Sequence, residues 1–156
     1  TPGKTHHRTP NIITSLELDP AEMEKRNIHL QKKYAEIEEN EVRFEELHCE
    51  DAEYLIVAFG SCARIAQKAM EMAREEGIKV GLLRPITLWP FPSKAIAARA
   101  AQVKGILTVE LNAGQMVEDV RLAVKCKVPV EHFGRLGGIV PDPDEVITAL
   151  KEKLIK

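Results

Sequence analysis

From Tyr54 onward the sequence alternates between short apolar runs and stretches with the period of a helix, and this alternation limits the fold more than any other feature. Residues 54–59 form a continuous apolar run that ends at Gly60-Ser61, which is the pattern of a strand buried on both faces. Apolar residues then recur at helical spacing up to Gly77, a residue suited to end a helix. Residues 54–77 are therefore predicted to form a strand, a turn and a helix.

The same unit repeats along the rest of the chain. The predicted strands are 78–83, 105–111 and 128–133, and the predicted helices are 93–103, 115–125 and one that opens with Asp142-Pro143. Residues 84–92 contain three prolines and are predicted to be an irregular loop. Val42, Phe44 and Leu47 suggest a short strand, and Glu41, Glu45 and Glu46 flank them, as in a protected edge strand. We expect a three-layer α/β/α domain with a mixed, mostly parallel five-stranded sheet and one antiparallel edge strand.

The N-terminal part has a different character. Residues 1–18 show no sustained period and the chain does not begin with Met, so we interpret them as an irregular linker from a missing upstream domain. Asp19-Pro20, followed by Glu22, supplies the signals that open a helix, and the helix is predicted to reach about Asn40. Residues 21–53 hold 11 acidic and 5 basic residues, a net charge of −6. The predicted domains are a linker at 1–18, a helical extension at 19–41 and an α/β domain at 42–156.

Composition excludes several classes of protein. With 44% apolar and 29% charged residues the chain is of ordinary globular type. Residues 1–8 are polar where a signal peptide would need an apolar segment, and the chain contains no run of about 18 apolar residues. Its formal charge of −2 offers no basic face. We therefore expect a cytoplasmic protein that binds neither membrane nor nucleic acid. Cys49, Cys62 and Cys126 form no CxxC pair, so no disulfide framework and no metal site is expected.

Candidate binding residues follow the predicted parallel strands, because ligands of open α/β sheets favour the carboxyl ends of strands. Gly60, Ser61 and Arg64 begin a predicted helix and form one candidate anion site, although a plain strand-to-helix turn explains them as well. Asn112 and Gly114, in the turn after the strand at 105–111, form a second candidate. Both are hypotheses about where a nucleotide or another anion would bind.

No residue is assigned a catalytic role. Ser61 lacks the glycine two residues later that a nucleophile elbow needs. His132 is more simply explained as a structural histidine, buried with a hydrogen bond or on the surface, than as a catalytic one. Glu110 and Asn112 are the best polar pair for a function, but capping of the following helix explains them equally well.

The proline-rich loop carries the one tryptophan of the chain. Leu88, Trp89 and Phe91 are candidate interface residues, because a rigid apolar loop gives contact area at little entropic cost. Packing over the edge of the sheet is an equally good explanation. If their partner were missing, these three residues would promote self-association of the chain.

Four sequence blocks together resemble one family. They are Val57-Ala-Phe-Gly-Ser61, Gly81-Leu-Leu-Arg-Pro-Ile-Thr-Leu-Trp-Pro-Phe-Pro92, Val109-Glu-Leu-Asn-Ala-Gly-Gln-Met116 and Phe133-Gly-Arg-Leu-Gly-Gly138. Over about residues 20–156 the chain resembles the C-terminal domain of the alpha subunit of 2-oxoacid:ferredoxin oxidoreductases, within them the 2-oxoisovalerate (branched-chain) branch. The second block is the most specific, and it also looks like the wider transketolase C-terminal domain.

The resemblance implies an enzyme that decarboxylates a branched-chain 2-oxoacid on thiamine diphosphate with magnesium, passes electrons through iron–sulfur clusters to ferredoxin, and yields an acyl-CoA. It also implies partners: an upstream pyrimidine-binding domain, a diphosphate-binding beta subunit, a gamma subunit and a ferredoxin-like delta subunit. The chain lacks the motifs for these cofactors, so we expect it to bind none, to be inactive alone and to serve assembly. Two alternatives stay open: an independent nucleotide- or CoA-binding module, or the same domain from a 2-oxoglutarate or pyruvate enzyme.

Overall fold

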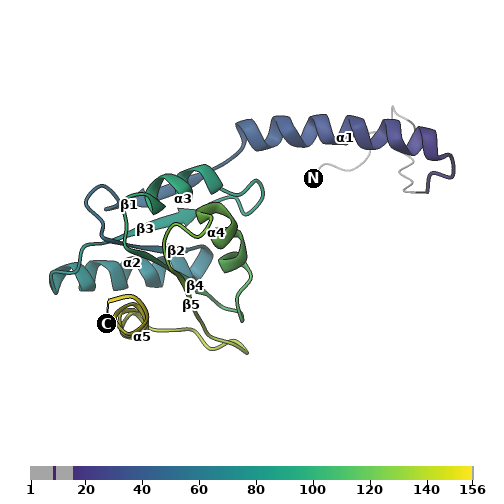
Figure 1. Ribbon diagram of the computed structural model, residues 1–156. Helices are drawn as coiled ribbons and strands as arrows, with labels where there is room; N and C mark the ends of the chain where they lie inside the picture. The colour runs from purple at the N-terminus through teal and green to yellow at the C-terminus, as the bar shows by residue number, and fades with distance from the viewer. Residues whose placement is uncertain (1–8, 10–15, 156) are drawn as a thin grey trace. The chain divides into compact units, whose positions relative to one another are not determined.

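The computed structural model describes residue 9 and residues 16–155, and the chain divides into two compact units between Ile37 and Glu38 (Figure 1). The predicted linker at 1–18 lies almost wholly outside the described residues. The division falls inside the last turn of the first helix, close to the predicted start of the α/β domain.

Helix α1 (Pro20–Asn40) has the bounds that its sequence predicts. The Asp19 carboxylate accepts a hydrogen bond from the Ala21 backbone N–H at 2.9 Å, and Glu22 forms an ion pair with Lys25 at 2.6 Å. Proline at the first helical position leaves no N–H without a partner there. None of the residues of α1 is buried. Local signals alone thus account for where this helix begins.

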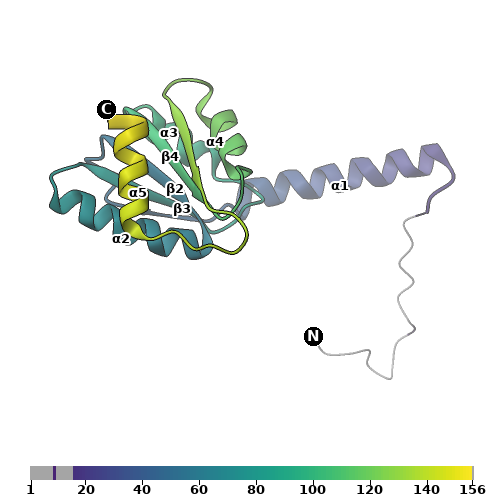
Figure 2. The ribbon, with the colours of Figure 1, turned by 90° about the horizontal axis from the view of Figure 1, so that it is seen from below.

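The second unit contains a five-stranded sheet in the order β1-β3-β2-β4-β5, which confirms the predicted mixed sheet. Figure 2 shows its three central strands, β3, β2 and β4, side by side. Its strands are β1 (Phe44–Leu47), β2 (Tyr54–Ala58), β3 (Val80–Pro85), β4 (Gly105–Glu110) and β5 (Val130–Gly134). The edge strand β1 runs antiparallel to β3, and the other neighbours are parallel. The charged residues of β1 therefore lie at a sheet edge, as predicted.

Helices cover both faces of the sheet (Figure 1). The helices are α2 (Gly60–Glu75), α3 (Ser93–Ala100), α4 (Met116–Val124) and α5 (Pro143–Leu150), which continues into a π-helical turn, η1 (Lys151–Ile155). Residues of α2 and α5 pack on the face that carries Ile56 and Leu107. Residues of α3 and α4 pack on the opposite face, around Leu55 and Ile106. Alternate residues of each strand thus enter two separate cores.

A capping box begins the last helix of this unit, and an ion pair holds its edge strand. At α5 the Asp142 carboxylate accepts from the Glu145 N–H at 3.0 Å, and Glu145 accepts from the Asp142 N–H at 3.2 Å, which completes the predicted capping box. Arg99 on α3 makes two hydrogen bonds to Glu46 on β1, at 2.6 and 2.9 Å. The charged edge strand is therefore tied to the helical layer.

The prediction of an irregular loop over residues 84–92 is wrong at its first two residues, because Arg84 and Pro85 belong to β3. Pro85 pairs with Phe44 of β1, whereas the pairing of β2 with β3 ends at Leu83. The next residue, Ile86, donates its N–H toward the β1 side. The backbone nitrogen of Pro85, which has no hydrogen to donate, therefore faces away from β1. The pairing of β3 with β2 has already ended at Leu83, so no N–H donor is needed there.

Candidate functional site

The loops that follow β2, β3 and β4 meet at the carboxyl edge of the sheet. They enclose a small cavity of about 170 Å³ lined by Phe59, Leu88, Phe91, Glu110, Gln115, Met116 and Asp119. Two of the predicted interface residues, Leu88 and Phe91, thus come together with Glu110. The candidate anion residues do not line this cavity.

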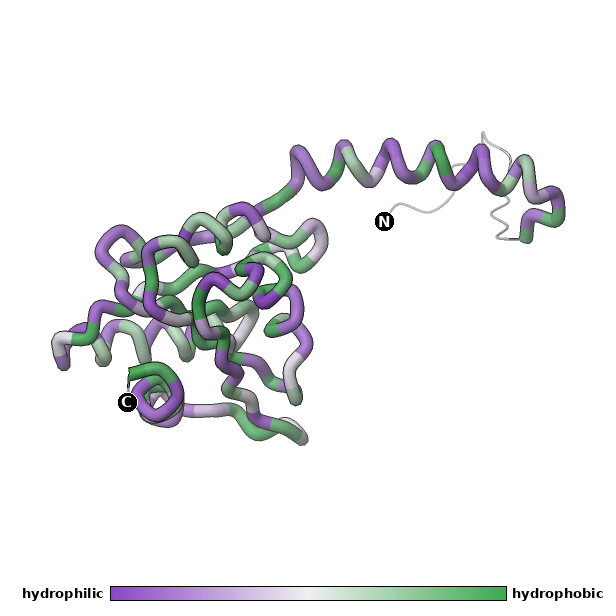
Figure 3. The backbone as a smooth tube through the Cα atoms, viewed as in Figure 1, coloured by the Kyte–Doolittle hydropathy of each residue, from purple (hydrophilic) through white to green (hydrophobic). Residues whose placement is uncertain are grey.

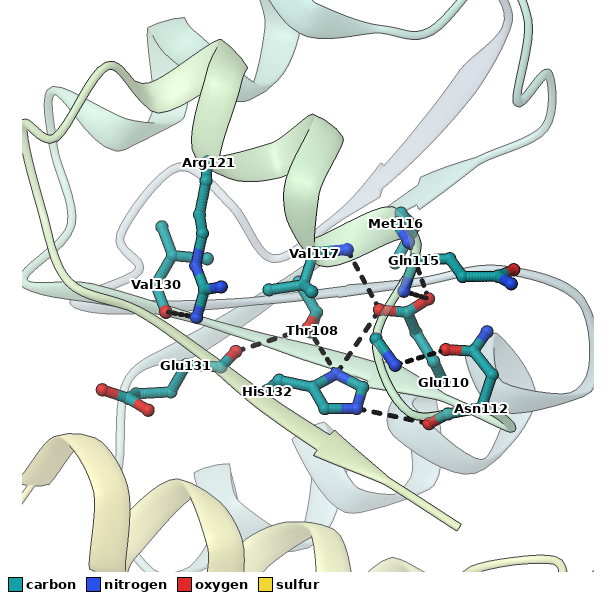
Figure 4. A network of polar contacts seen from close by, with 11 residues as sticks. Thr108, Glu110, Asn112, Gln115, Met116, Val117, Arg121, Val130, Glu131 and His132 are labelled. Carbon is teal, nitrogen blue, oxygen red and sulfur yellow. Dashed lines mark hydrogen bonds and ion pairs between the residues drawn. The ribbon is translucent and has the colours of Figure 1, made fainter. Parts of the chain in front are cut away.

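Glu110 is the charged residue that organises this edge (Figure 4). Its side chain is fully buried, and its two oxygens accept hydrogen bonds from the backbone N–H groups of Gln115, Met116 and Val117 at 3.2, 2.8 and 3.0 Å. These N–H groups open α4, whose N-terminal end favours a negative charge. A residue at the end of a strand therefore caps the helix that follows it.

His132 of β5 completes the network from the neighbouring strand. Its Nδ1 lies 3.4 Å from Glu110 Oε1 and 3.2 Å from Thr108 Oγ1, and its Nε2 lies 3.3 Å from the Asn112 carbonyl oxygen. Parallel pairing sets this contact, because His132 lies opposite Thr108 in register. At Gly134 a Cβ atom would collide with the Asn112 carbonyl oxygen and lie 2.6 Å from His132 Nε2, so only glycine fits. Sequence reasoning considered His132 alone and missed its partner.

The turn with Asn112 and Gly114 already has internal acceptors for its N–H groups. Gly114 donates to the Asn112 side-chain oxygen at 2.7 Å, and the next three N–H groups donate to Glu110. The Glu110 carboxylate thus takes the place that an external anion would take at this helix. For Glu110 and Asn112 the sequence left two explanations open, a functional role and capping of the following helix. The hydrogen bonds to Glu110 are those of a helix cap.

The other candidate anion residues lie at the start of α2. Phe59 is the N-cap residue and no side chain caps this helix, while Gly60 has a φ of +56°, a value that favours glycine. Gly60, Ser61 and Arg64 are exposed. Burial and, to a smaller extent, the Glu110 charge raise the pKa of the neighbouring Cys62 thiol. Anion binding at this helix stays a prediction.

The proline-rich loop forms one wall of a larger groove. The groove measures about 740 Å³ and is lined by Glu38, Glu39, Val42, Phe44, Trp89, Pro90, Phe91, Pro92, Ser93, Lys94 and Ala95. Leu88 and Trp89 are 48% and 54% exposed, whereas Phe91 packs against the core. Thr87 accepts from the Arg43 N–H at 3.0 Å and donates to the Pro90 carbonyl at 2.8 Å, which fixes the loop.

The described residues do not fit a metal or an iron–sulfur cluster. No three His, Cys, Asp or Glu side chains within residues 16–155 could hold a metal ion. Cys49 and Cys62 are buried on opposite faces of the sheet, and Cys126 is exposed. Burial raises the pKa of Cys49 to about 11, which disfavours the thiolate that binds metals. In the same part of the chain, no helix is long and apolar enough to cross a membrane.

The fold of the domain is similar to that of a solved transketolase structure. A split-gene transketolase matches 72% of this chain and 41% of its own, with a TM-score of 0.62 and 20% identity. The domain is therefore a transketolase-like α/β domain, as the sequence predicted. The model of the family described as pyruvate:ferredoxin oxidoreductase core domain II matches residues 52–146, and the chain belongs to this family.

Relatives and a second solved structure agree with this assignment. The ketoisovalerate oxidoreductase subunit VorB of Methanothermobacter marburgensis is 46% identical over 91% of this chain, and 2-oxoglutarate synthase subunit KorA of the same organism is 33% identical over 65%. The 2-oxoglutarate:ferredoxin oxidoreductase from Magnetococcus marinus, with 2-oxoglutarate, coenzyme A and succinyl-CoA bound, matches 87% of this chain and 24% of its own, at a TM-score of 0.74 and 26% identity. The chain spans 40% of the length of the first of these relatives and 27% of the second.

Proposed function

We propose that this chain is a non-catalytic domain of the alpha subunit of a thiamine-diphosphate-dependent 2-oxoacid:ferredoxin oxidoreductase, and that it serves assembly of the enzyme. The complete enzyme would oxidatively decarboxylate a branched-chain 2-oxoacid, 2-oxoisovalerate (ketoisovalerate), to an acyl-CoA and reduce ferredoxin. The observation that carries the proposal is the identity of 46% to a ketoisovalerate oxidoreductase subunit, against 33% to a 2-oxoglutarate subunit.

An assembly role fits what the polar groups of the domain do. Glu110, which is the most buried charged group, has its oxygens engaged by three backbone N–H groups and a histidine. Among the described residues, no buried side-chain nitrogen or oxygen lacks a hydrogen-bond partner. The core is thus built for rigidity, and chemistry on thiamine diphosphate, magnesium and iron–sulfur clusters would occur on other parts of the enzyme.

The exposed apolar loop is the proposed contact with those other parts. Trp89 offers a large apolar side chain on a loop that Thr87 holds in place. Tryptophan on rigid backbone is the type of residue that dominates interface energies. Its proposed partners are the pyrimidine-binding domain of the same subunit and the beta, gamma and delta subunits.

Reconstitution tests the substrate. We would join the chain to the rest of its alpha subunit, co-express it with the other subunits, and measure CoA-dependent reduction of ferredoxin. The expected result is higher kcat/KM with ketoisovalerate than with 2-oxoglutarate or pyruvate. A preference for either of the other two acids would replace the proposed substrate by one of the alternatives.

A matched pair of variants tests the assembly role. Trp89→Ala should lower the yield of assembled enzyme without changing the unfolding midpoint of the isolated chain. Leu122→Ala, at an apolar residue that is 74% exposed on α4, is the control and should leave assembly unchanged. Equal yields from both variants would remove the loop from the interface.

Titration calorimetry of the isolated chain separates assembly from ligand binding. Thiamine diphosphate, CoA and ADP should each give no heat of binding. Heat with CoA or ADP that disappears in Arg64→Ala would instead support an independent nucleotide- or CoA-binding module at the start of α2.

A further inference from the structure

Helix α1 carries a repeating sequence pattern, and none of its residues is buried. Three apolar residues, Met23, Leu30 and Ile37, are spaced seven apart, and Asn27 and Tyr34 lie between them at alternating spacings of four and three. In a heptad written abcdefg, the first three occupy d positions and the other two occupy a positions. Figure 3 shows the same helix as mainly hydrophilic with separated hydrophobic positions, and no residue of it is buried.

The width of this stripe distinguishes between two kinds of partner. A helix that lies on a globular core shows an apolar face about 100° wide or more, with three to four apolar residues in every two turns. The seam of a two-stranded coiled coil is narrower and uses a and d positions alone. The e positions of α1 are Glu24, Gln31 and Glu38, and its g positions include Arg26 and Lys33. Polar residues thus flank the seam on both sides.

Asn27 adds a second argument for a coiled coil. A single asparagine at an a position lowers stability but fixes register and the number of strands, because two asparagines can hydrogen-bond across the seam. On a surface packed against a globular core it would leave a buried amide in need of a partner.

The charges indicate the relative direction of the strands. In a parallel pair each g residue faces the e residue of the following heptad on the partner helix, which places Lys33 opposite Glu38 and Arg26 opposite Gln31. In an antiparallel pair a residues pack against d residues and g residues face g residues, so Arg26 would face Lys33 and the two like charges would repel. The parallel arrangement is therefore favoured.

Local contributions alone leave α1 short of stability. Helices in proteins draw most of their stability from packing of an apolar face, and the Asp19 cap and the Glu22–Lys25 pair add little to a helix that buries none of its 21 residues. We propose that α1 is a dimerisation helix, which pairs with α1 of a second copy of this chain as a parallel two-stranded coiled coil with Asn27 opposite Asn27. This proposal is independent of the proposed enzymatic function.

A charge-swap series on the 156-residue chain tests the proposal by sedimentation equilibrium. Lys33→Glu and Glu38→Lys should each weaken the dimer about fivefold, since each places like charges opposite one another twice. The double variant K33E/E38K should restore wild-type association. Lys32→Glu is the matched control, because it makes the same charge change at an f position outside the seam.

Two further variants probe the seam itself. Asn27→Ile should tighten the dimer. Leu30→Lys should abolish it, whereas Ile28→Lys, at a position that is 52% exposed outside the seam, should not. A strict monomer at the highest soluble concentration would overturn the proposal. So would a tighter dimer in Lys33→Glu, which indicates antiparallel strands, or a dimer that survives Leu30→Lys but is lost in Trp89→Ala.

Discussion

Helix α1 and strand β4 contrast two ways in which one chain specifies structure. The start of α1 follows from Asp19, Pro20 and Glu22, and none of the residues of this helix is buried. All six residues of β4 are buried, including the charged Glu110, whose position depends on α4 and β5. The contrast teaches that local signals can place a helix, whereas a buried charge is tolerated only where distant segments supply its partners.

The largest expected effect comes from removing that buried charge. Glu110→Ala should lower the free energy of unfolding of the α/β domain by about 4 kcal/mol, because three buried N–H groups lose their acceptor. Glu22→Ala, on the exposed surface of α1, should change it by less than about 0.5 kcal/mol. Urea unfolding followed by circular dichroism measures both. Similar small losses of unfolding free energy in Glu110→Ala and Glu22→Ala would contradict the contrast between β4 and α1.

A buried and an exposed aliphatic residue extend the comparison to apolar contacts. Leu107→Ala in β4 should cost about 3 kcal/mol, because the side chain is fully buried and leaves a cavity. Ile28→Ala in α1 should cost less than about 0.5 kcal/mol, since the side chain is 52% exposed. Comparable losses measured by urea unfolding would mean that α1 is packed against the domain in solution.

Loss of the ion pair between Glu46 and Arg99 should have an effect on the free energy of unfolding that lies between those of the buried and the exposed residues. A side-chain hydrogen bond from Arg99 holds the pKa of Glu46 below its usual value of 4.5. The pair therefore stabilises the fold above the unfolded pKa, and this stability is lost as the pH falls through the folded pKa. Glu46→Gln should cost about 1 kcal/mol at pH 7 and progressively less below about pH 4.5.

Thermal unfolding of wild type and variant across the acid range measures this difference. The neighbouring Glu45, whose partner Arg84 is more exposed, is the matched control, and Glu45→Gln should cost less at pH 7. A Glu46→Gln difference that stays constant down to pH 3 would contradict the assigned ion pair.

The smallest expected effect is on the reactivity of the cysteine thiols, with no change in the free energy of unfolding. Cys126 is exposed and should react rapidly with a thiol reagent at neutral pH. Cys49 and Cys62 should react only on unfolding, because burial raises the pKa of both thiols. Cys126→Ser should remove the fast phase of labelling, measured by mass spectrometry. Rapid labelling of Cys49 or Cys62 in the folded variant would show that the face of the core that holds this cysteine opens easily.

The features that the sequence predicts correctly are those that depend on residues close together in the chain. The start of α1, the capping box at Asp142 and the antiparallel edge strand follow from caps, prolines and charge patterns, and the structure confirms them. Arg84 and Pro85 escaped this reasoning because their place in β3 depends on β1, a segment far away in the sequence. A proline at the end of a strand is permitted where the ladder needs no donor.

The candidate site shows the same limit. The sequence singled out Glu110 and Asn112 but left open what they do, because the answer depends on which N–H groups lie within reach once α4 has formed. His132 meets Glu110 because β4 and β5 pair in a particular register, and a pattern along one strand does not contain that information. The groove beside Trp89 likewise involves residues that precede β1, the first residue of β1 and the start of α3.

The reversed direction of β1 determines where other polypeptide can be attached. Phe44, at its start, lies beside Pro85 at the end of β3, so residues that precede β1 join the domain at the carboxyl edge. Leu154 of η1 touches Gly105, at the opposite end of β4. An affinity tag or a fused reporter placed after η1 would thus leave the edge with Glu110 and Trp89 clear, whereas the same addition just before β1 would crowd it.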